Sequence, residues 1–140
     1  MKKVHINVLK PPQEQLDILL KYYQTGLYVE AEKLSLSITQ EFPKHQFAWK
    51  VLAGVLKQNG KINESLIISK KLLQLDPQDA ATHYNLSVLL QSLGRLEEAE
   101  VSYKKAIELD PKLLIAYNNL GIVYSNLGKY NLAIESYVDA

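Results

Sequence analysis

The chain has 140 residues, of which 47% are hydrophobic and 22% charged, a balance typical of a folded domain with one core. Its 16 Lys and Arg against 15 Asp and Glu leave a net charge of +1, which excludes the strong basic field that attracts nucleic acids or anionic membranes. Because the chain has no cysteine, disulfides and thiolate chemistry are excluded as well.

Residues 1–11 are expected to form a flexible N-terminal arm, with a docked strand as the alternative. Val4–Leu9 alternates apolar and polar residues as a strand does, but so short a strand is not stable without a partner. The same stretch is too short and too polar for a signal peptide. No window approaches the run of about 18 apolar residues that spans a membrane, so we expect a cytoplasmic protein that does not insert into membranes.

Glycines and prolines recur along the rest of the chain at a fixed interval. Glycines stand at 26, 60, 94 and 128, and prolines at 43, 77 and 111, so the interval is 34 residues. A period of this size indicates stacked units that bury their apolar faces against one another. Within each unit the glycine is suited to end one helix and the proline to stop a second, which predicts a helical hairpin.

In chain order, the units are expected at residues 12–45, 46–79, 80–113 and 114–140, the first departing most from the common pattern and the last being incomplete. Apolar residues at three- and four-residue spacing predict two helices in each unit. The first helices are expected to begin near Gln13, Gln46, Ala80 and Leu114, and the second near Tyr28, Ile62, Leu96 and Tyr130.

The units resemble the tetratricopeptide repeat family, whose pattern has characteristic large, small and aromatic positions. The fourth unit carries the pattern through Tyr117, Leu120, Gly121, Tyr124, Ala133, Tyr137 and Ala140, and the third through Leu86, Ser87, Ala99, Tyr103, Ala106 and Pro111. The second unit has Ser65 and Ser69 where Ala and an aromatic are usual, and the first has Leu19 at a small-residue position. The resemblance implies an all-α, right-handed superhelical solenoid of antiparallel helix pairs.

One face of each first helix is expected to lie opposite the core, because its positions cluster at 100° per residue away from the core positions. In the resembling family this face lines the concave ligand groove. The groove residues expected from this are Lys50, Gly54, Lys57, Tyr84, Asn85, Val88, Gln91, Ile115, Asn118, Asn119, Ile122 and Asn126. Val51 falls on the same face. Neutral amides dominate this set, and amides pair with peptide units whatever the side chains of the ligand are.

Asn85 and Asn119 share one unit position and stand one repeat apart. They are similar to the asparagine ladder in the superhelical domains of O-linked N-acetylglucosamine transferases, where such residues hold the backbone of a substrate peptide. The alternative is that Asn is simply a common residue at this exposed position. The carboxylate clamp of heat-shock co-chaperones fits poorly, because Ile115 and Asn119 stand where it requires two cations.

Catalysis and metal binding have little support in the sequence. His5, His45 and His83 do not share a helix face, and the nucleotide-binding, hydrolase and calcium-loop motifs are absent. We therefore expect a non-enzymatic scaffold without cofactor or metal, which binds an extended peptide or protein segment and no nucleic acid. The alternatives are a self-assembling structural array or the targeting module of a larger enzyme.

The final helix offers a further expectation, an apolar face with no following repeat to cover it. The face comprises Tyr130, Ala133, Ile134, Tyr137 and Val138. Exposed apolar patches of this kind mark interaction sites, so either the chain is a fragment of a longer protein or another copy covers this end. We favour the fragment and expect it to self-associate through Tyr130, Ile134, Tyr137 and Val138.

Overall fold

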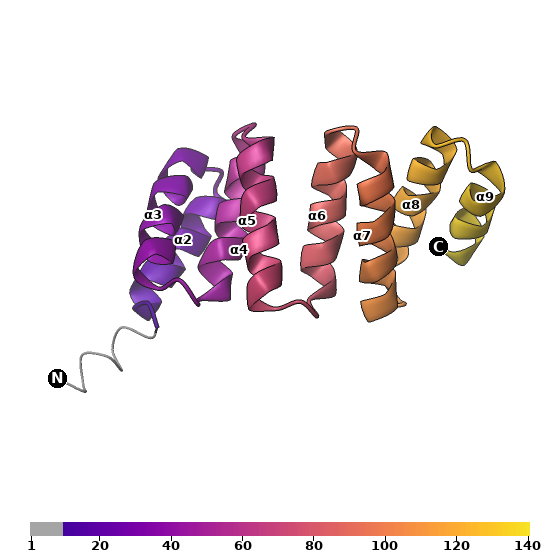
Figure 1. Cartoon of the computed structure of the whole chain (residues 1–140). Coiled ribbons are helices and arrows are strands. Elements are labelled where there is room, and N and C mark those ends of the chain that lie inside the picture. The colour runs from indigo at the N-terminus through magenta and orange to yellow at the C-terminus, as the bar shows by residue number, and fades with distance from the viewer. Residues whose placement is uncertain (1–9) are drawn as a thin grey trace. The chain divides into compact units, whose positions relative to one another are not determined.

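The protein is described by a computed structural model, which covers residues 10–140 and contains helices joined by short turns over that range (Figure 1). The chain divides after Leu75 into two compact units. The N-terminal unit contains α2 (Gln13–Gln24), α3 (Tyr28–Glu41), α4 (Gln46–Gln58) and α5 (Ile62–Leu75). The C-terminal unit contains α6 (Ala80–Ser92), α7 (Leu96–Leu109), α8 (Leu114–Asn126) and α9 (Tyr130–Asp139).

The expected all-α architecture and all eight expected helix starts are confirmed within residues 10–140. In the N-terminal unit α2 pairs with α3 and α4 with α5, while in the C-terminal unit α6 pairs with α7 and α8 with α9. Successive pairs pack through α3 against α4 and through α7 against α8. None of the described helices is long and apolar enough to cross a membrane.

Glycine ends the first helix of every pair in the left-handed conformation. The φ angles are +78° at Gly26, +78° at Gly60, +74° at Gly94 and +77° at Gly128. The amide after each glycine donates to the carbonyl five residues earlier, as Leu27 does to Tyr22 at 2.9 Å and Lys129 to Tyr124 at 2.7 Å. This arrangement satisfies carbonyls that the helix end would otherwise leave open, which explains why the glycine recurs with the period of the repeat.

The core of the N-terminal unit lies between α2, α3 and α4. It is built from Leu19, Ala31, Ile38, Phe42, Ala48, Val51 and Val55. The expectation that Val51 lines an open groove is wrong, because its side chain is only 6% exposed and belongs to this core. The expected arm lies mostly outside the described residues, and Pro11, at its end, is buried.

In the C-terminal unit a tyrosine of α9 packs directly on a glycine of α8. A Cβ atom placed on Gly121 would lie 2.5 Å from Cε1 of Tyr137, which is closer than atoms can approach. This repeat therefore has a glycine at the small-residue position because the ring of Tyr137 occupies the space that a larger side chain would need. Ala133 is buried as well, so the expectation that it belongs to an open apolar face is wrong.

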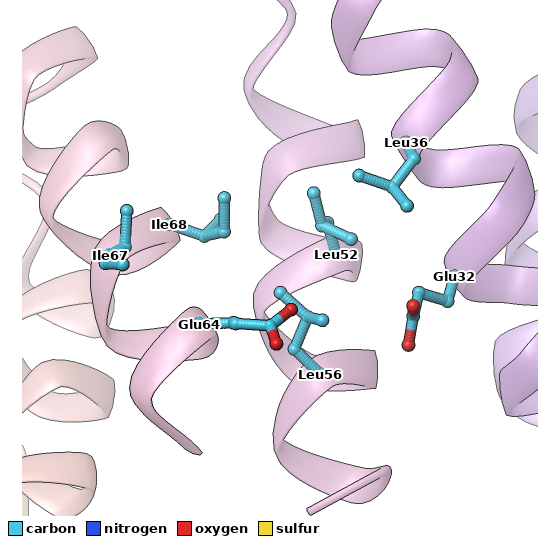
Figure 2. A pocket seen from close by; sticks show the side chains of 7 residues that line it. All are labelled: Glu32, Leu36, Leu52, Leu56, Glu64, Ile67 and Ile68. Carbon is cyan, nitrogen blue, oxygen red and sulfur yellow. The ribbon is translucent and has the colours of Figure 1, made fainter. Parts of the chain in front are cut away.

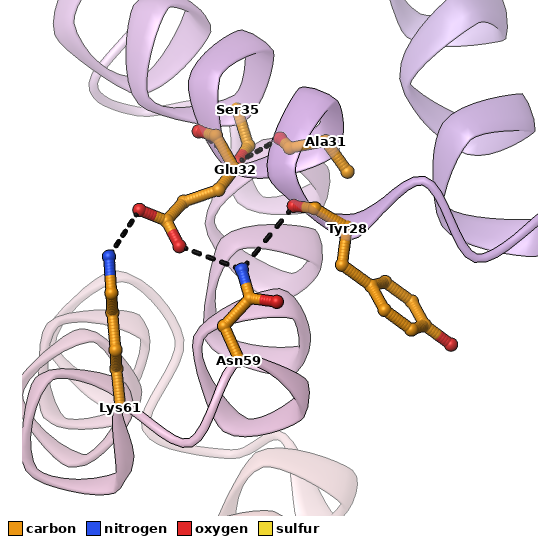
Figure 3. Close-up of polar contacts among 6 residues, drawn as sticks. All are labelled: Tyr28, Ala31, Glu32, Ser35, Asn59 and Lys61. Atoms are coloured by element: carbon orange, nitrogen blue, oxygen red, sulfur yellow. Dashed lines mark hydrogen bonds and ion pairs between the residues drawn. The ribbon is translucent and has the colours of Figure 1, made fainter.

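A glutamate on the second helix of one pair binds the turn of the next pair, in each unit. In the N-terminal unit Glu32 accepts hydrogen bonds from Lys61 at 2.8 Å and from Asn59 at 2.9 Å (Figure 3). These hydrogen bonds, that from Lys61 foremost, lower the pKa of Glu32. In the C-terminal unit Glu100 accepts from Lys129 at 2.8 Å. The two contacts lie 68 residues apart, which is two periods.

A second recurring contact closes the loop before a first helix. The indole nitrogen of Trp49 donates to the carbonyl of Pro43 at 2.8 Å. One period later, Nε2 of His83 lies 2.9 Å from the carbonyl of Pro77. His83 thus takes the place of a tryptophan as a structural residue that closes the loop.

Candidate functional site on the first helices

The candidate groove residues of the C-terminal unit lie on α6 and α8. Ile115, Asn118, Ile122 and Asn126 are exposed on α8, and Asn85 is exposed on α6. Tyr84, Val88, Gln91 and Asn119 are half-buried. None of these nine residues carries a charge. The site therefore offers amide hydrogen-bonding groups and apolar side chains, and it is suited to uncharged parts of a ligand.

Asn119 is already engaged within the protein. Its Nδ2 donates to the hydroxyl of Tyr84 at 3.0 Å and so joins α8 to α6. The Asn119 amide also acts on the buried hydroxyl of Tyr103, so its donor side faces two tyrosines, and the amide oxygen is the group that it offers to a ligand. Asn85 is exposed, and the sequence-predicted pair of asparagines thus consists of one free-standing side chain and one fixed by a tyrosine.

Tyr103 of α7 is a buried residue that contacts two side chains of the same site, Tyr84 and Gln91. Its ring is fully buried and lies 5.9 Å from the ring of Tyr84, between centroids. Its hydroxyl donates to Oε1 of Gln91 at 2.7 Å. Burial raises the pKa of Tyr103 to about 12, with Tyr84 adding to the effect and the Asn119 amide opposing it. The phenol therefore stays neutral and continues to orient Gln91 at physiological pH.

Sequence reasoning missed the part that Tyr103 plays here, because it assigned the residue only to the core. One indication was present in the sequence: Tyr103 occupies the same repeat position as Tyr137, one period later. What could not be read from the sequence was that its hydroxyl reaches past the core to Gln91.

The candidate residues of the N-terminal unit lie together on α4 but form a less open surface. Lys50 and Lys57 are exposed, and Gly54 between them is half-buried. A Cβ on Gly54 would lie 2.8 Å from the hydroxyl of Tyr23, so this tyrosine of α2 sits over the glycine. Tyr23 is half-buried and packs against the core, and the sequence did not suggest that it covers this part of α4.

The candidate face of α9 is exposed as expected for four of its residues. The exposed fractions are 66% for Tyr130, 61% for Ile134, 43% for Tyr137 and 77% for Val138. Tyr137 differs from the others because one edge of its ring packs on Gly121.

Among residues 10–140 there is no group of three or more His, Asp or Glu side chains that could hold a metal ion. The expectation of no catalysis and no cofactor stays a prediction.

Two sequence families match the middle of the chain. One, described as TPR repeat, matches residues 89–128, and the other, described as Tetratricopeptide repeat, matches residues 69–101. No curated protein sequence matches the chain.

Solved structures of MamA are similar to the whole fold. A crystal structure of MamA has a TM-score of 0.88 at 20% identity and covers 99% of this chain and 81% of that one. A second crystal structure of MamA protein has a TM-score of 0.85 at 24% identity, covering 91% and 69%. MamA 41-end from Desulfovibrio magneticus RS-1 has 0.85 at 20% identity, covering 91% and 72%.

At these identities the likeness establishes the fold and not the partner. It supports the repeat in general rather than the transferase domains in particular. Tetratricopeptide repeats generally mediate protein–protein interactions and are typically not catalytic. Residues 69–128 therefore match models of the tetratricopeptide repeat, and the described residues 10–140 form an all-α array in which eight helices pack pairwise.

Proposed function

We propose that the protein is an interaction scaffold which binds an extended segment of a partner protein along α6 and α8. The observation that carries the proposal is the set of uncharged, accessible groups on these two helices, with Asn85, Asn118 and Asn119 beside Ile115 and Ile122. Amides bind the backbone of any extended peptide, and isoleucines contact its apolar side chains. The likeness to the asparagine ladder of glycosyltransferase repeats supports backbone recognition in the same way.

The test uses a random linear peptide library selected on the wild-type protein and then counter-selected on the double variant Asn85→Ala/Asn119→Ala. Each amide contributes one or two hydrogen bonds, so the selected peptides should bind the double variant roughly 5- to 150-fold more weakly. Equal affinity for both proteins would overturn the proposal.

Tyr84→Phe is the matched control, because it removes the hydroxyl that accepts from Asn119 at 3.0 Å and leaves the amide itself unchanged. If Asn119 acts on the ligand, Tyr84→Phe should bind nearly as well as the wild type. If Tyr84→Phe instead loses as much affinity as Asn119→Ala, the asparagine positions the tyrosine and is not itself a contact.

Self-association through α9 is the second candidate function, favoured by the exposure of Ile134 and Val138. Sedimentation velocity at increasing concentration tests it, comparing the wild type with Ile134→Lys/Val138→Lys. Tyr137 is left unchanged because it packs on Gly121 and its loss would disturb the fold. A monomer at every concentration, in both proteins, would exclude self-association.

A further inference from the structure

An apolar pocket of about 200 Å³ opens on the second-helix side of the N-terminal unit (Figure 2). It lies between α3 and α5, over α4, and is lined by Glu32, Leu36, Leu52, Leu56, Glu64, Ile67 and Ile68. Two of the lining side chains are largely in solvent, with Leu36 40% and Ile67 65% exposed. Isolated exposed apolar residues are ordinary, but here they form the rim of a hollow whose floor is also apolar.

This pocket is separate from the candidate groove. On α4 its floor is formed by Leu52 and Leu56, whereas Lys50, Gly54 and Lys57 carry the groove side. At 100° per residue these two sets lie on opposite sides of the helix. A ligand in the pocket therefore leaves the groove face of α4 open.

Two of the corresponding positions in the C-terminal unit carry a larger ring and a cation. Two periods after Leu56 stands Tyr124, which is 5% exposed, and two periods after Leu36 stands Lys104. The ammonium groups of Lys104 and Lys129 lie 5.7 and 6.0 Å from the centroid of the Tyr124 ring. The N-terminal unit thus has two leucines, Leu56 and Leu36, at positions where the C-terminal unit has an aromatic ring and a cation over it.

The charge at the rim indicates what kind of side chain completes the N-terminal pocket. Glu32 is neutralised by Lys61, with which it forms an ion pair at 2.8 Å. Glu64 is exposed and forms no direct ion pair within residues 10–140, and its carboxylate points toward the pocket (Figure 2). The rim therefore carries one carboxylate, that of Glu64, which can pair with a cation of a ligand. The floor beside it is apolar and suits an uncharged side chain.

The volume limits the occupant to about one large side chain. Ligand pockets generally exceed about 300 Å³, whereas a cavity of about 150 Å³ already accommodates a benzene ring. Anchors of protein interfaces are typically single aromatic or aliphatic side chains buried in such hollows.

We propose that this pocket is a second docking site, which takes one leucine, isoleucine or aromatic side chain of a partner protein while a neighbouring lysine or arginine of that partner pairs with Glu64.

The experiment selects a random linear peptide library on the wild-type chain and counter-selects it on Leu56→Tyr, which puts into the pocket the larger residue that stands at the corresponding position, Tyr124. The selected peptides should share a large apolar residue next to Lys or Arg. Their affinity, measured by fluorescence anisotropy, should fall at least about 10-fold on Leu56→Tyr. It should fall roughly 2- to 5-fold on Glu64→Gln, and this smaller loss should vanish in high salt.

Two further variants keep the result interpretable. Ile67→Gln alters only an exposed rim residue, so it retains the fold and should weaken binding even if Leu56→Tyr proves unstable. Asn85→Ala/Asn119→Ala removes the groove amides and should leave binding to the pocket unchanged, which separates this proposal from the function proposed above.

Three outcomes would overturn the proposal. The first is a peptide pool that binds Leu56→Tyr and Ile67→Gln as well as the wild type. The second is a pool without basic residues whose affinity does not respond to Glu64→Gln. The third is concentration-dependent self-association that Ile67→Gln abolishes, since the occupant would then be a second copy of the chain.

Discussion

Leu19 and Ser35 of the N-terminal unit occupy the repeat positions that Gly121 and Tyr137 occupy in the C-terminal unit. In the C-terminal unit the first helix carries the small residue and the second helix the large one, and the ring packs on the glycine. In the N-terminal unit the first helix carries the large residue, Leu19, and the second helix the small one, Ser35. Both are fully buried. What the two units share at these positions is therefore the combined volume of the two side chains, and not the particular residues.

The largest effect on stability should come from moving the large side chain from the first helix of the N-terminal unit to the second. Leu19→Ala should destabilise the N-terminal unit by about 2–5 kcal/mol through the cavity it leaves, and Ser35→Tyr alone should cost about 1–3 kcal/mol through overpacking. The double variant should cost clearly less than the sum, because the ring enters the space that the leucine vacates. Urea unfolding followed by the fluorescence of Trp49 measures this, since the single tryptophan lies on α4.

The control for this cycle is Leu19→Ala combined with Ser37→Tyr, where Ser37 is an exposed residue of the same helix. That pair should be additive. Additivity in the Leu19 and Ser35 pair as well would show that the two positions do not share one space.

A smaller effect distinguishes the two helical glycines. Gly121→Ala should cost about 1–3 kcal/mol, because its Cβ would meet the Tyr137 ring at 2.5 Å. Gly54→Ala should cost less than Gly121→Ala, because its nearest contact is the hydroxyl of Tyr23 at 2.8 Å, with ring atoms no closer than 3.3 Å, while alanine favours the helix. Hydrogen exchange of α8 and the fluorescence of Trp49 report the two changes separately.

Tyr137→Leu tests the cause of the Gly121 effect. It should recover most of the stability that Gly121→Ala loses, since the shorter side chain leaves room for the added methyl group. A Gly121→Ala variant that is equally destabilised with and without Tyr137→Leu would contradict the steric explanation.

The helix boundaries could be predicted because their signals are local. Gly26 and Gly60 recur at one interval and end their helices through their own backbone conformation, so the sequence alone places the turns. The exposure of Ile134 and Val138 followed similarly from the periodicity of one helix.

The contacts across helices could not be predicted in the same way. The bond from Asn119 to Tyr84 joins residues 35 positions apart and depends on how closely two first helices approach. Val51 was misplaced because α2 packs over α4 and buries a side chain that helical spacing puts on the groove face. The pocket was missed although Leu56 stands where Tyr124 stands two repeats later, because a missing ring appears as a hollow only when its neighbours are also small.

The smallest expected effect compares the two interhelical glutamates in acid. Burial alone would raise the pKa of Glu100, but the hydrogen bonds from Lys104 and Lys129 more than offset it and lower that pKa below the ordinary 4.5. The pKa of Glu32 is lowered mainly by the hydrogen bond from Lys61. In both cases the folded pKa lies below the unfolded one, so the stabilisation is present above pH 4.5 and is lost as the pH falls through the folded pKa.

The lysines are half in solvent, so each glutamate should contribute no more than about 1 kcal/mol. Glu32→Gln should flatten the acid dependence of Trp49 fluorescence unfolding, and Glu100→Gln should flatten that of hydrogen exchange in α7. Glu100 holds two cations where Glu32 holds one, so its variant should lose more at neutral pH. An acid dependence that both variants share unchanged with the wild type would mean that neither ion pair links its helices.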